Sequence, residues 1–331
     1  MSAFQMKVKM WGARGSLPSS PSPAAIHKRI AQALELFLDR GNAKKEDIQP
    51  FLNSLPSHQV GGYGGNTPCI EVKTCQPDQS LIIDGGSGIR TLGYELMAGP
   101  CGKGTGEVHI LFTHFHWDHL LGLPFFTPMF IPGNKIHVYA VQPDLPDIFR
   151  TVFRKPYFPL NLEQIGATIV YHRLEPRKTV EFWDMKVTPY QLDHPDPCWG
   201  YRIERGGRSV AHCVDTECTR MSREEMGPDL PLYQNLDLMI FDAQYTLMET
   251  IEKVNWGHAA ASLGIDIALR EAVKKVVFMH HDPASSDEKI AEAEAQCRRY
   301  YDSQLKSAKR SGVTVPAVDW LFAREGMTFE V

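Results

Sequence analysis

The stretch Leu111-Phe112-Thr113-His114-Phe115-His116-Trp117-Asp118-His119 joins a short apolar run to three histidines and one aspartate within six positions. Imidazole nitrogens and carboxylate oxygens are the ligands that zinc, manganese and iron accept at neutral pH. A polar turn whose histidines only cap backbone groups would not explain so many ligand groups in one loop. Because they exceed what one tetrahedral ion takes from a single turn, we expect two neighbouring metal ions with further ligands from elsewhere in the chain.

Length and composition favour a globular protein. The chain has 331 residues, 43% of them hydrophobic, so it can bury a sizeable core. Its formal net charge of −4 disfavours a protein that coats long polyanions, because phosphate neutralisation requires an excess of Lys and Arg. No stretch reaches the roughly 18 apolar residues of a membrane span, and the first residues lack the apolar segment of a secretory signal. The seven scattered cysteines indicate reduced thiols, and we expect a cytoplasmic protein.

Apolar runs predict many short strands with few long helices between them. The expected strands are residues 7–11, 69–74, 81–84, 107–113, 135–141, 168–171, 180–183, 185–192, 199–204, 209–214, 236–241, 275–279, 318–323 and 327–331. The expected helices outside the insertion are residues 89–97, 258–271 and 285–308. We expect residues 143–161, which are rich in proline and aromatics, to be irregular. With no long linker or repeat, residues 1–331 are predicted to form a single domain.

Residues 20–56 interrupt the series of strands. Within them Ile26, Ile30 and Leu34 recur at helical spacing, so we interpret the segment as a helical insertion. Its apolar stripe needs either the core or a partner to cover it, and we favour the core.

Four of the predicted strands run into potential metal ligands. The strand at 107–113 is followed by His114, the one at 185–192 by Asp193 and His194, the one at 209–214 by Asp215, and the one at 275–279 by His280. Strands that share one edge of a sheet present their ends to one crevice, where sites on α/β scaffolds usually lie. We therefore expect these side chains to converge.

The converging residues divide into two ligand sets. The first ion would take three imidazoles, from His114, His116 and His194. The second would take Asp118, His119 and His280, with Asp215 bridging both. His281 competes for the last position, and we prefer His280 because it directly follows the strand. A water shared by two cations about 3.5–4 Å apart is deprotonated near neutral pH, which predicts a hydrolase. Zn²⁺ is the first candidate, with Mn²⁺ and Fe²⁺ as alternatives that availability decides.

A glycine-rich loop precedes the strand at 69–74. It contains four glycines in seven residues, Gly61-Gly62-Tyr63-Gly64-Gly65-Asn66-Thr67. Such a loop can bring backbone amides close to an anion, or it can be a plain tight turn. We assign Asn66 and Thr67 as candidate substrate-binding residues.

These residues resemble the metallo-β-lactamase superfamily, whose signature is His-x-His-x-Asp-His followed by a distant His, Asp and His. The resemblance covers nearly the whole chain apart from residues 20–56 and 285–308. It implies an α/β fold, a four-layer αββα sandwich with inserted helices, and two metals at the open edge of the sheets.

Shorter matches resemble the phosphodiesterase branch, which includes tRNase Z, phosphoribosyl cyclic phosphodiesterase and cyclic-nucleotide phosphodiesterases. The matching segments are Gly12-Ala13-Arg14-Gly15-Ser16, Gly64-Gly65-Asn66-Thr67, Asp84-Gly85-Gly86-Ser87-Gly88, Asp215-Thr216 and Trp256-Gly257-His258-Ala259-Ala260. In tRNase Z an acidic residue pairs with a histidine that opens the helix before the last metal-binding strand. Here Asp242 and His258 match that pair. The resemblance implies that His258 and Asp242 assist the leaving oxygen while Asp118 orients the attacking water.

The chain also departs from tRNase Z, whose protruding arm is rich in glycine and basic residues. Residues 140–188 hold prolines and aromatics instead, so we expect no large nucleic acid as partner. The expected substrate is a small phosphodiester such as a cyclic nucleotide or a ribose cyclic phosphate. Aromatic residues that can stack on a base are Phe125, Phe126, Phe130, Tyr157, Phe158 and Trp199, although core positions compete for each.

Three other functions stay open. One is a thioester or lactone hydrolase on the same scaffold, one is a tRNA 3′-processing endonuclease, and one is a non-catalytic module that binds nucleotides or a protein through residues 20–56. A homodimer is a further possibility. We expect no membrane partner.

Overall fold

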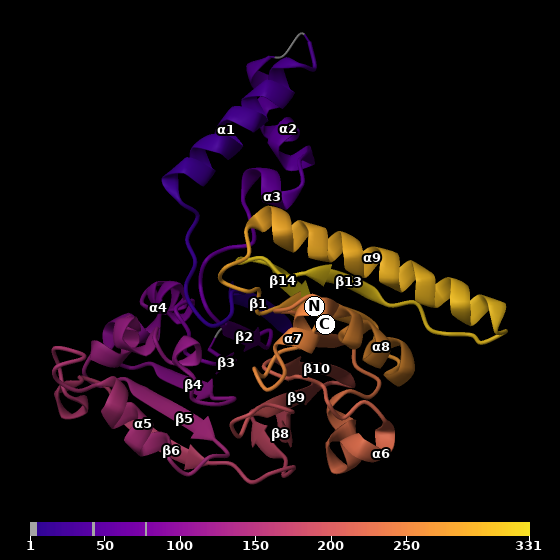
Figure 1. Cartoon of the computed structure of the whole chain (residues 1–331). Coiled ribbons are helices and arrows are strands. Elements are labelled where there is room, and N and C mark those ends of the chain that lie inside the picture. The colour runs from indigo at the N-terminus through magenta and orange to yellow at the C-terminus, as the bar shows by residue number, and fades with distance from the viewer. Residues whose placement is uncertain (1–4, 42–43, 77) are drawn as a thin grey trace.

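The computed structural model describes residues 5–41, 44–76 and 78–331 (Figure 1). These residues form two seven-stranded mixed sheets. In sheet order, the first contains β14 (Thr328–Glu330), β1 (Lys7–Gly12), β2 (Cys69–Lys73), β3 (Ser80–Ile83), β4 (Glu107–Leu111), β5 (Lys135–Ala140) and β6 (Thr168–Arg173). The second contains β13 (Asp319–Phe322), β12 (Lys275–Met279), β11 (Leu238–Asp242), β10 (Arg208–Cys213), β9 (Trp199–Arg205), β8 (Met185–Gln191) and β7 (Val180–Phe182).

The mixed topology places parallel strands beside the site. Strands β3 to β6 are parallel, and so are β10 to β13, whereas the remaining neighbours pair antiparallel. The hairpin between β9 and β10 turns through Gly206 and Gly207, both with positive φ, as the glycine signal predicted.

Helices α4 (Ile89–Leu96) and α5 (Leu145–Val152) cover the outer face of the first sheet, and α8 (Ala261–Glu271) and α9 (Asp287–Arg310) cover that of the second. The other helices are α1 (Pro23–Leu38), α2 (Ile48–Ser54), α3 (Ser57–Val60), α6 (Arg223–Met226) and α7 (Leu247–Glu252). One buried apolar cluster joins α4 and α5 to the first sheet, a second lies between the sheets, and a third joins the second sheet to α8 and α9. The predicted four-layer αββα sandwich is therefore confirmed.

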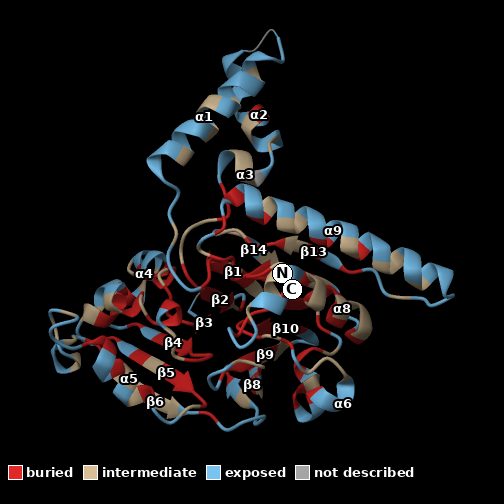
Figure 2. Cartoon of the chain, viewed as in Figure 1, coloured by how far each residue is buried: buried red, intermediate tan, exposed pale blue. Residues whose placement is uncertain are grey.

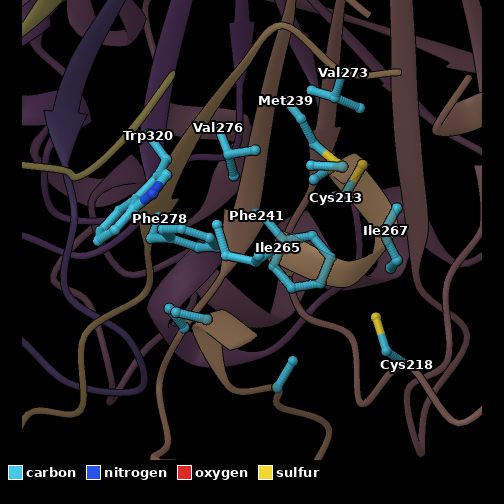
Figure 3. Close-up of a cluster of buried hydrophobic side chains, with 14 of the residues drawn as sticks. Cys213, Cys218, Met239, Phe241, Ile265, Ile267, Val273, Val276, Phe278 and Trp320 are labelled. Atoms are coloured by element: carbon cyan, nitrogen blue, oxygen red, sulfur yellow. The ribbon is translucent and has the colours of Figure 1, made fainter. Parts of the chain in front are cut away.

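Figure 3 shows part of the third cluster, where Phe241 of β11, Phe278 of β12 and Ile265 of α8 lie together. The rings of Phe241 and Phe278 meet edge to face with centroids 6.2 Å apart. Gly264 lets α8 approach closely, because a Cβ there would lie 2.7 Å from both rings. This packing fixes the ends of β11 and β12, from which Asp242 and His280 extend.

The helical insertion does not join the core, and our expectation for its apolar stripe was wrong. Helix α1 has no buried residue, and Figure 2 shows α1 and α2 largely exposed above the body. Ile26, Ile30, Leu34 and Leu38 are between 46% and 69% exposed. Within the insertion, Phe51 of α2 is buried against Phe37 of α1, so α1 packs chiefly against the neighbouring helices of the insertion.

Two local predictions also need correction. Residues 143–161 are not wholly irregular, because α5 forms with Pro146 in its first turn, where a missing N–H costs nothing. Leu145, Phe149 and Val152 then recur on its buried face. The helix expected at 258–271 begins at Ala261, so His258 lies in the preceding loop. No helix within the described ranges is long and apolar enough to cross a membrane.

Candidate metal centre

Each of the four strand ends delivers its side chain to one place. His114 follows β4, His194 follows β8, Asp215 follows β10 and His280 follows β12. Asp215 and His280 adopt positive φ values of 38° and 66°, as does Asp84 after β3 with 64°. Such conformations are unfavourable for non-glycine residues and are typical of functional sites, where surrounding structure holds them.

The first predicted ligand set comes together in space. Ligand atoms of His114, His116, His194 and Asp215 all lie within 4.8 Å of one another. Nε2 of His114 lies 3.4 Å from Oδ2 of Asp215, and the rings of His116 and His194 are 4.8 Å apart. The set has the three imidazoles and one carboxylate that zinc accepts.

The second set adjoins it through Asp215. Ligand atoms of Asp118, His119, Asp215 and His280 also lie within 4.8 Å of one another. Nε2 of His280 lies 3.2 Å from Oδ2 of Asp118 and 3.1 Å from Oδ1 of Asp215. Because Asp215 belongs to both groups, it is placed as a bridging carboxylate would be.

Hydrogen bonds fix the outward nitrogen of most of these histidines. Nδ1 of His119 donates to Oδ2 of Asp84 at 2.8 Å, and Nδ1 of His280 donates to Oε1 of Gln244 at 2.7 Å. Carboxylate and amide oxygens only accept, so Nε2 of both rings keeps its lone pair facing the cluster. Nε2 of His116 donates to Asp196 at 2.8 Å, which leaves Nδ1 as its inward atom.

Two hydrogen bonds in series, through the hydroxyl of Thr113, connect His114 to Asp84. Nδ1 of His114 lies 3.0 Å from the hydroxyl of Thr113, and that hydroxyl donates to Asp84 at 3.0 Å. The hydroxyl therefore accepts from His114, and Asp84 orients ligands of both sets. Such outer partners hold ring orientation and raise ligand basicity.

Inward atoms of the cluster are buried without protein partners. Nε2 of His114, His119 and His194 and Oδ1 of Asp215 have no hydrogen-bond partner. Leaving buried polar atoms unsatisfied costs about 1–3 kcal/mol each, so structures rarely tolerate several at one point. Two divalent cations would satisfy these atoms, and the residues present therefore fit a dinuclear metal centre.

The electrostatics favour cations in the same place. Burial opposes a charge on His119, yet Asp118, Asp215 and Asp84 outweigh it and raise the pKa of this imidazole well above its usual value. Burial likewise opposes ionisation of Asp118, but His119 and His280 hold its pKa well below the usual range. The buried carboxylates thus create a negative potential that cations would neutralise.

Asp242 and His258 form a pair beside the second set. Nδ1 of His258 lies 2.9 Å from Oδ2 of Asp242, and its ring stacks on His280 with centroids 4.7 Å apart. Oδ1 of Asp242 accepts from the backbone N–H of Gln244 and Ala259. Burial opposes protonation of His258, but Asp242, Asp215 and Asp118 outweigh it and raise its pKa to about 9. The sequence match thus falls on two residues that contact each other at the cluster.

The other predicted residues lie elsewhere or have structural partners. Nε2 of His281 donates to the carbonyl of Ala323 at 2.9 Å, so His280 and not His281 faces the cluster. Thr67 is fully buried, and its hydroxyl accepts from the Ser87 N–H. The amide of Asn66 donates to Glu325. Binding of substrate by Asn66 and Thr67 therefore stays a prediction, and these bonds give both residues a role in joining loops.

The predicted aromatic set does not line one pocket. Phe126 and Trp199 are buried in the core. Phe125, Phe130 and Phe153 instead gather around Phe158, with centroid distances between 5.6 and 6.4 Å.

Sequence reasoning missed the outer partners Asp84, Gln244 and Asp196, and the Ser16 N–H that donates to Asp118 at 2.7 Å. Asp84 could have been found from the sequence, because it follows a short apolar run, as His114 and Asp215 do. Two glycines follow it. Gln244 and Asp196 carried none, since their roles depend on contacts between distant segments.

Comparisons with known proteins agree with this geometry. The family model described as the beta-lactamase superfamily domain matches residues 81–281, which contain all seven ligand candidates. The chain belongs to this superfamily.

Curated relatives include Ribonuclease BN of Cronobacter sakazakii, 28% identical over 41% of this chain and 46% of that protein. Ribonuclease Z of Streptococcus agalactiae is 25% identical over 56% of this chain and 62% of that protein. The chain thus spans about half the length of the curated relatives it matches. Among solved structures, the metallo-beta-lactamase fold protein YhfI of Bacillus subtilis superposes with a TM-score of 0.61 at 16% identity, over 99% of this chain and 100% of that one. That likeness concerns the fold alone.

Proposed function

We propose that this protein is a dinuclear metal phosphodiesterase that hydrolyses a small phosphodiester, with cyclic nucleotides and ribose cyclic phosphates as the first substrates to test. The observation that carries the proposal is the Asp242–His258 pair, 2.9 Å apart and stacked against the candidate ligand His280. Hydrolysis of a phosphodiester must stabilise charge on phosphoryl oxygens and protonate a leaving alkoxide, and an imidazole held by a carboxylate serves both needs.

The seven candidate ligands would hold two cations, Zn²⁺ first and Mn²⁺ or Fe²⁺ as alternatives: His114, His116, Asp118, His119, His194, Asp215 and His280. When bound, such cations polarise a phosphoryl oxygen and lower the pKa of a water molecule. Oδ2 of Asp118 accepts from the Ser16 N–H, which fixes the carboxylate for orienting the nucleophile. Asp242 holds Nδ1 of His258, so Nε2 is the atom that delivers a proton to the leaving oxygen.

The test is hydrolysis of bis(p-nitrophenyl) phosphate and of a panel of cyclic nucleotides by protein loaded with Zn²⁺ or Mn²⁺. We expect turnover that needs the metal and falls at least about a hundredfold in His116→Ala, as loss of a metal ligand implies. No turnover by wild-type protein of known metal content, or full activity in His116→Ala, would refute the proposal. A thioester or lactone hydrolase would instead show faster ester turnover and would tolerate Asp242→Asn.

A second candidate is tRNA 3′-end processing, favoured by the names of the curated relatives, Ribonuclease BN and Ribonuclease Z. For this candidate the protruding insertion would serve as the arm. Residues 20–56 carry five basic residues (Lys28, Arg29, Arg40, Lys44 and Lys45) against four acidic ones (Glu35, Asp39, Glu46 and Asp47). A net charge of +1 gives little attraction for a folded RNA. Cleavage of a precursor tRNA at rates comparable with small phosphodiesters would favour this candidate.

A further inference from the structure

Solvent reaches the metal centre from one side. Of the seven candidate ligands, His116 is exposed and His194 is partly exposed, whereas the other five are buried. The His116 side chain is 44% accessible, and Asp196, which accepts its hydrogen bond, is 68% accessible. A substrate therefore reaches the metal centre at the edge formed by His116 and His194, which we call the mouth of the site.

Two exposed tryptophans belong to backbone segments that lie next to this mouth. Trp117 directly follows His116, so their Cα atoms lie about 3.8 Å apart, and it is 64% exposed. Trp256 is 65% exposed. It precedes Gly257, and a Cβ added to that glycine would lie 2.3 Å from Cδ2 of His194. The ring of His258 lies 6.2 Å from that of His194, and Trp256 lies two residues before His258 in the chain.

Single exposed apolar residues are normal on protein surfaces. Two exposed tryptophans on segments beside one candidate metal centre are different, because indoles are the largest apolar side chains and lose the most by facing water. Trp183 illustrates the contrast. It is 41% exposed but precedes β8, whose opposite end leads to His194. That position is at the far end of the strand from the mouth.

We propose that Trp117 and Trp256 are specificity-determining residues that stack on a flat aromatic group carried by the phosphodiester substrate. This inference rests on the proposed function and names its substrate class. Stacking of a base on an aromatic side chain is worth roughly 5- to 150-fold in affinity. The exposed carboxylate of Asp196 at the mouth disfavours further phosphates nearby, so the class is a single phosphodiester with one aromatic substituent and not a nucleic-acid strand.

The test compares two substrates with the same leaving group, methyl p-nitrophenyl phosphate and 1-naphthyl p-nitrophenyl phosphate. We expect the wild-type protein to prefer the naphthyl ester by at least about fivefold in kcat/KM, mainly through KM. Trp117→Ala and Trp256→Ala should each reduce this ratio at least about threefold, and Trp117→Phe should keep most of it. Trp183→Ala is the matched control and should change neither substrate. Metal content is measured for every variant.

A second measurement does not need turnover. Methyl(1-naphthylmethyl)phosphinate has two P–C bonds and no ester bond to hydrolyse. It should quench the fluorescence of the wild-type protein with an affinity that falls in Trp117→Ala and Trp256→Ala but not in Trp183→Ala. Equal loss on both esters, or an unchanged naphthyl preference with unchanged phosphinate affinity, would overturn the proposal. No hydrolysis of either ester by metal-loaded wild-type protein would instead reject the proposed function, while the phosphinate titration would still decide the stacking.

Discussion

Replacing Asp242 by Asn tests the chemistry of the site with little change of shape. Oδ1 of Asp242 accepts from the N–H groups of Gln244 and Ala259 at 3.0 and 3.2 Å, and the oxygen of Asn can keep both bonds. The amide nitrogen would then face Nδ1 of His258, 2.9 Å from the present Oδ2. Two donors cannot share that bond, so the imidazole loses the partner that fixes its tautomer and stabilises its charge.

The expected cost depends on the leaving group. General acid catalysis typically contributes about 10²- to 10⁴-fold, equivalent to about 2.7–5.4 kcal/mol of barrier. An alkoxide needs that proton, whereas p-nitrophenolate departs without one. We therefore expect Asp242→Asn and His258→Ala to slow hydrolysis of a cyclic nucleotide by roughly 10²- to 10⁴-fold and of bis(p-nitrophenyl) phosphate by less than about tenfold.

The assay measures kcat for both substrates at fixed pH, with metal content determined on the same samples. Asp266→Asn is the matched control, because the Asp266 carboxylate accepts from the hydroxyl of Tyr300 on α9 and lies outside the cluster. Equal losses on the two substrates would refute the assignment of His258 as the general acid. Loss of metal from Asp242→Asn would show instead that Asp242 is needed to keep the metal ions bound.

Further predictions concern the metals, the core, the insertion and acid stability. Chelation should lower the midpoint of thermal unfolding, because Nε2 of His114 and His119 and Oδ1 of Asp215 are buried without a hydrogen-bond partner. Metal analysis should find two ions per chain, falling below one in Asp215→Ala, and an unchanged midpoint would contradict the fit. Phe278→Ala, at a fully buried ring, should lower the free energy of unfolding by about 3–5 kcal/mol in denaturant titrations, and a loss below about 1 kcal/mol would contradict the packing. Leu34→Ser on the exposed face of α1 should change it by less than about 0.5 kcal/mol, whereas a large loss would mean that this face is covered. Burial, with help from His137, lowers the pKa of His109 to about 4, below its unfolded value of 6.5, so the unfolded chain binds this proton more tightly; stability should therefore fall as pH drops from about 6.5 to 4, and His109→Leu should flatten that fall in unfolding curves.

The sequence predicted which side chains meet at the cluster because each candidate ligand follows a local signal. A short apolar run that ends in histidine or aspartate is visible in the chain, and four such runs meet once parallel strands share an edge. His280 could be chosen over His281 for the same reason, and its ring faces Asp118 and Asp215 as expected. The Asp242–His258 pair needed a family pattern, because nothing local links a strand end to a loop before α8.

What depended on distant contacts could not be predicted. The stripe of Ile26, Ile30 and Leu34 has the same period whether it packs on the core or faces water, and only the structure shows it exposed. Helix α5 was missed because prolines and aromatics resemble a loop, although Pro146 is compatible with the first turn. Gln244 and Asp196 orient ligands through contacts that no spacing in the sequence reveals.

The proposed function requires this protein to hydrolyse phosphodiesters in preference to thioesters and lactones. The most direct measurement is the ratio of kcat/KM for a cyclic-nucleotide phosphodiester to that for a thioester or lactone, on one metal-loaded preparation of known content. The Asp242–His258 pair beside the cluster predicts a ratio of at least about a hundred, the smallest contribution expected of the general acid. A thioester or lactone turned over faster than every phosphodiester tested would contradict the account.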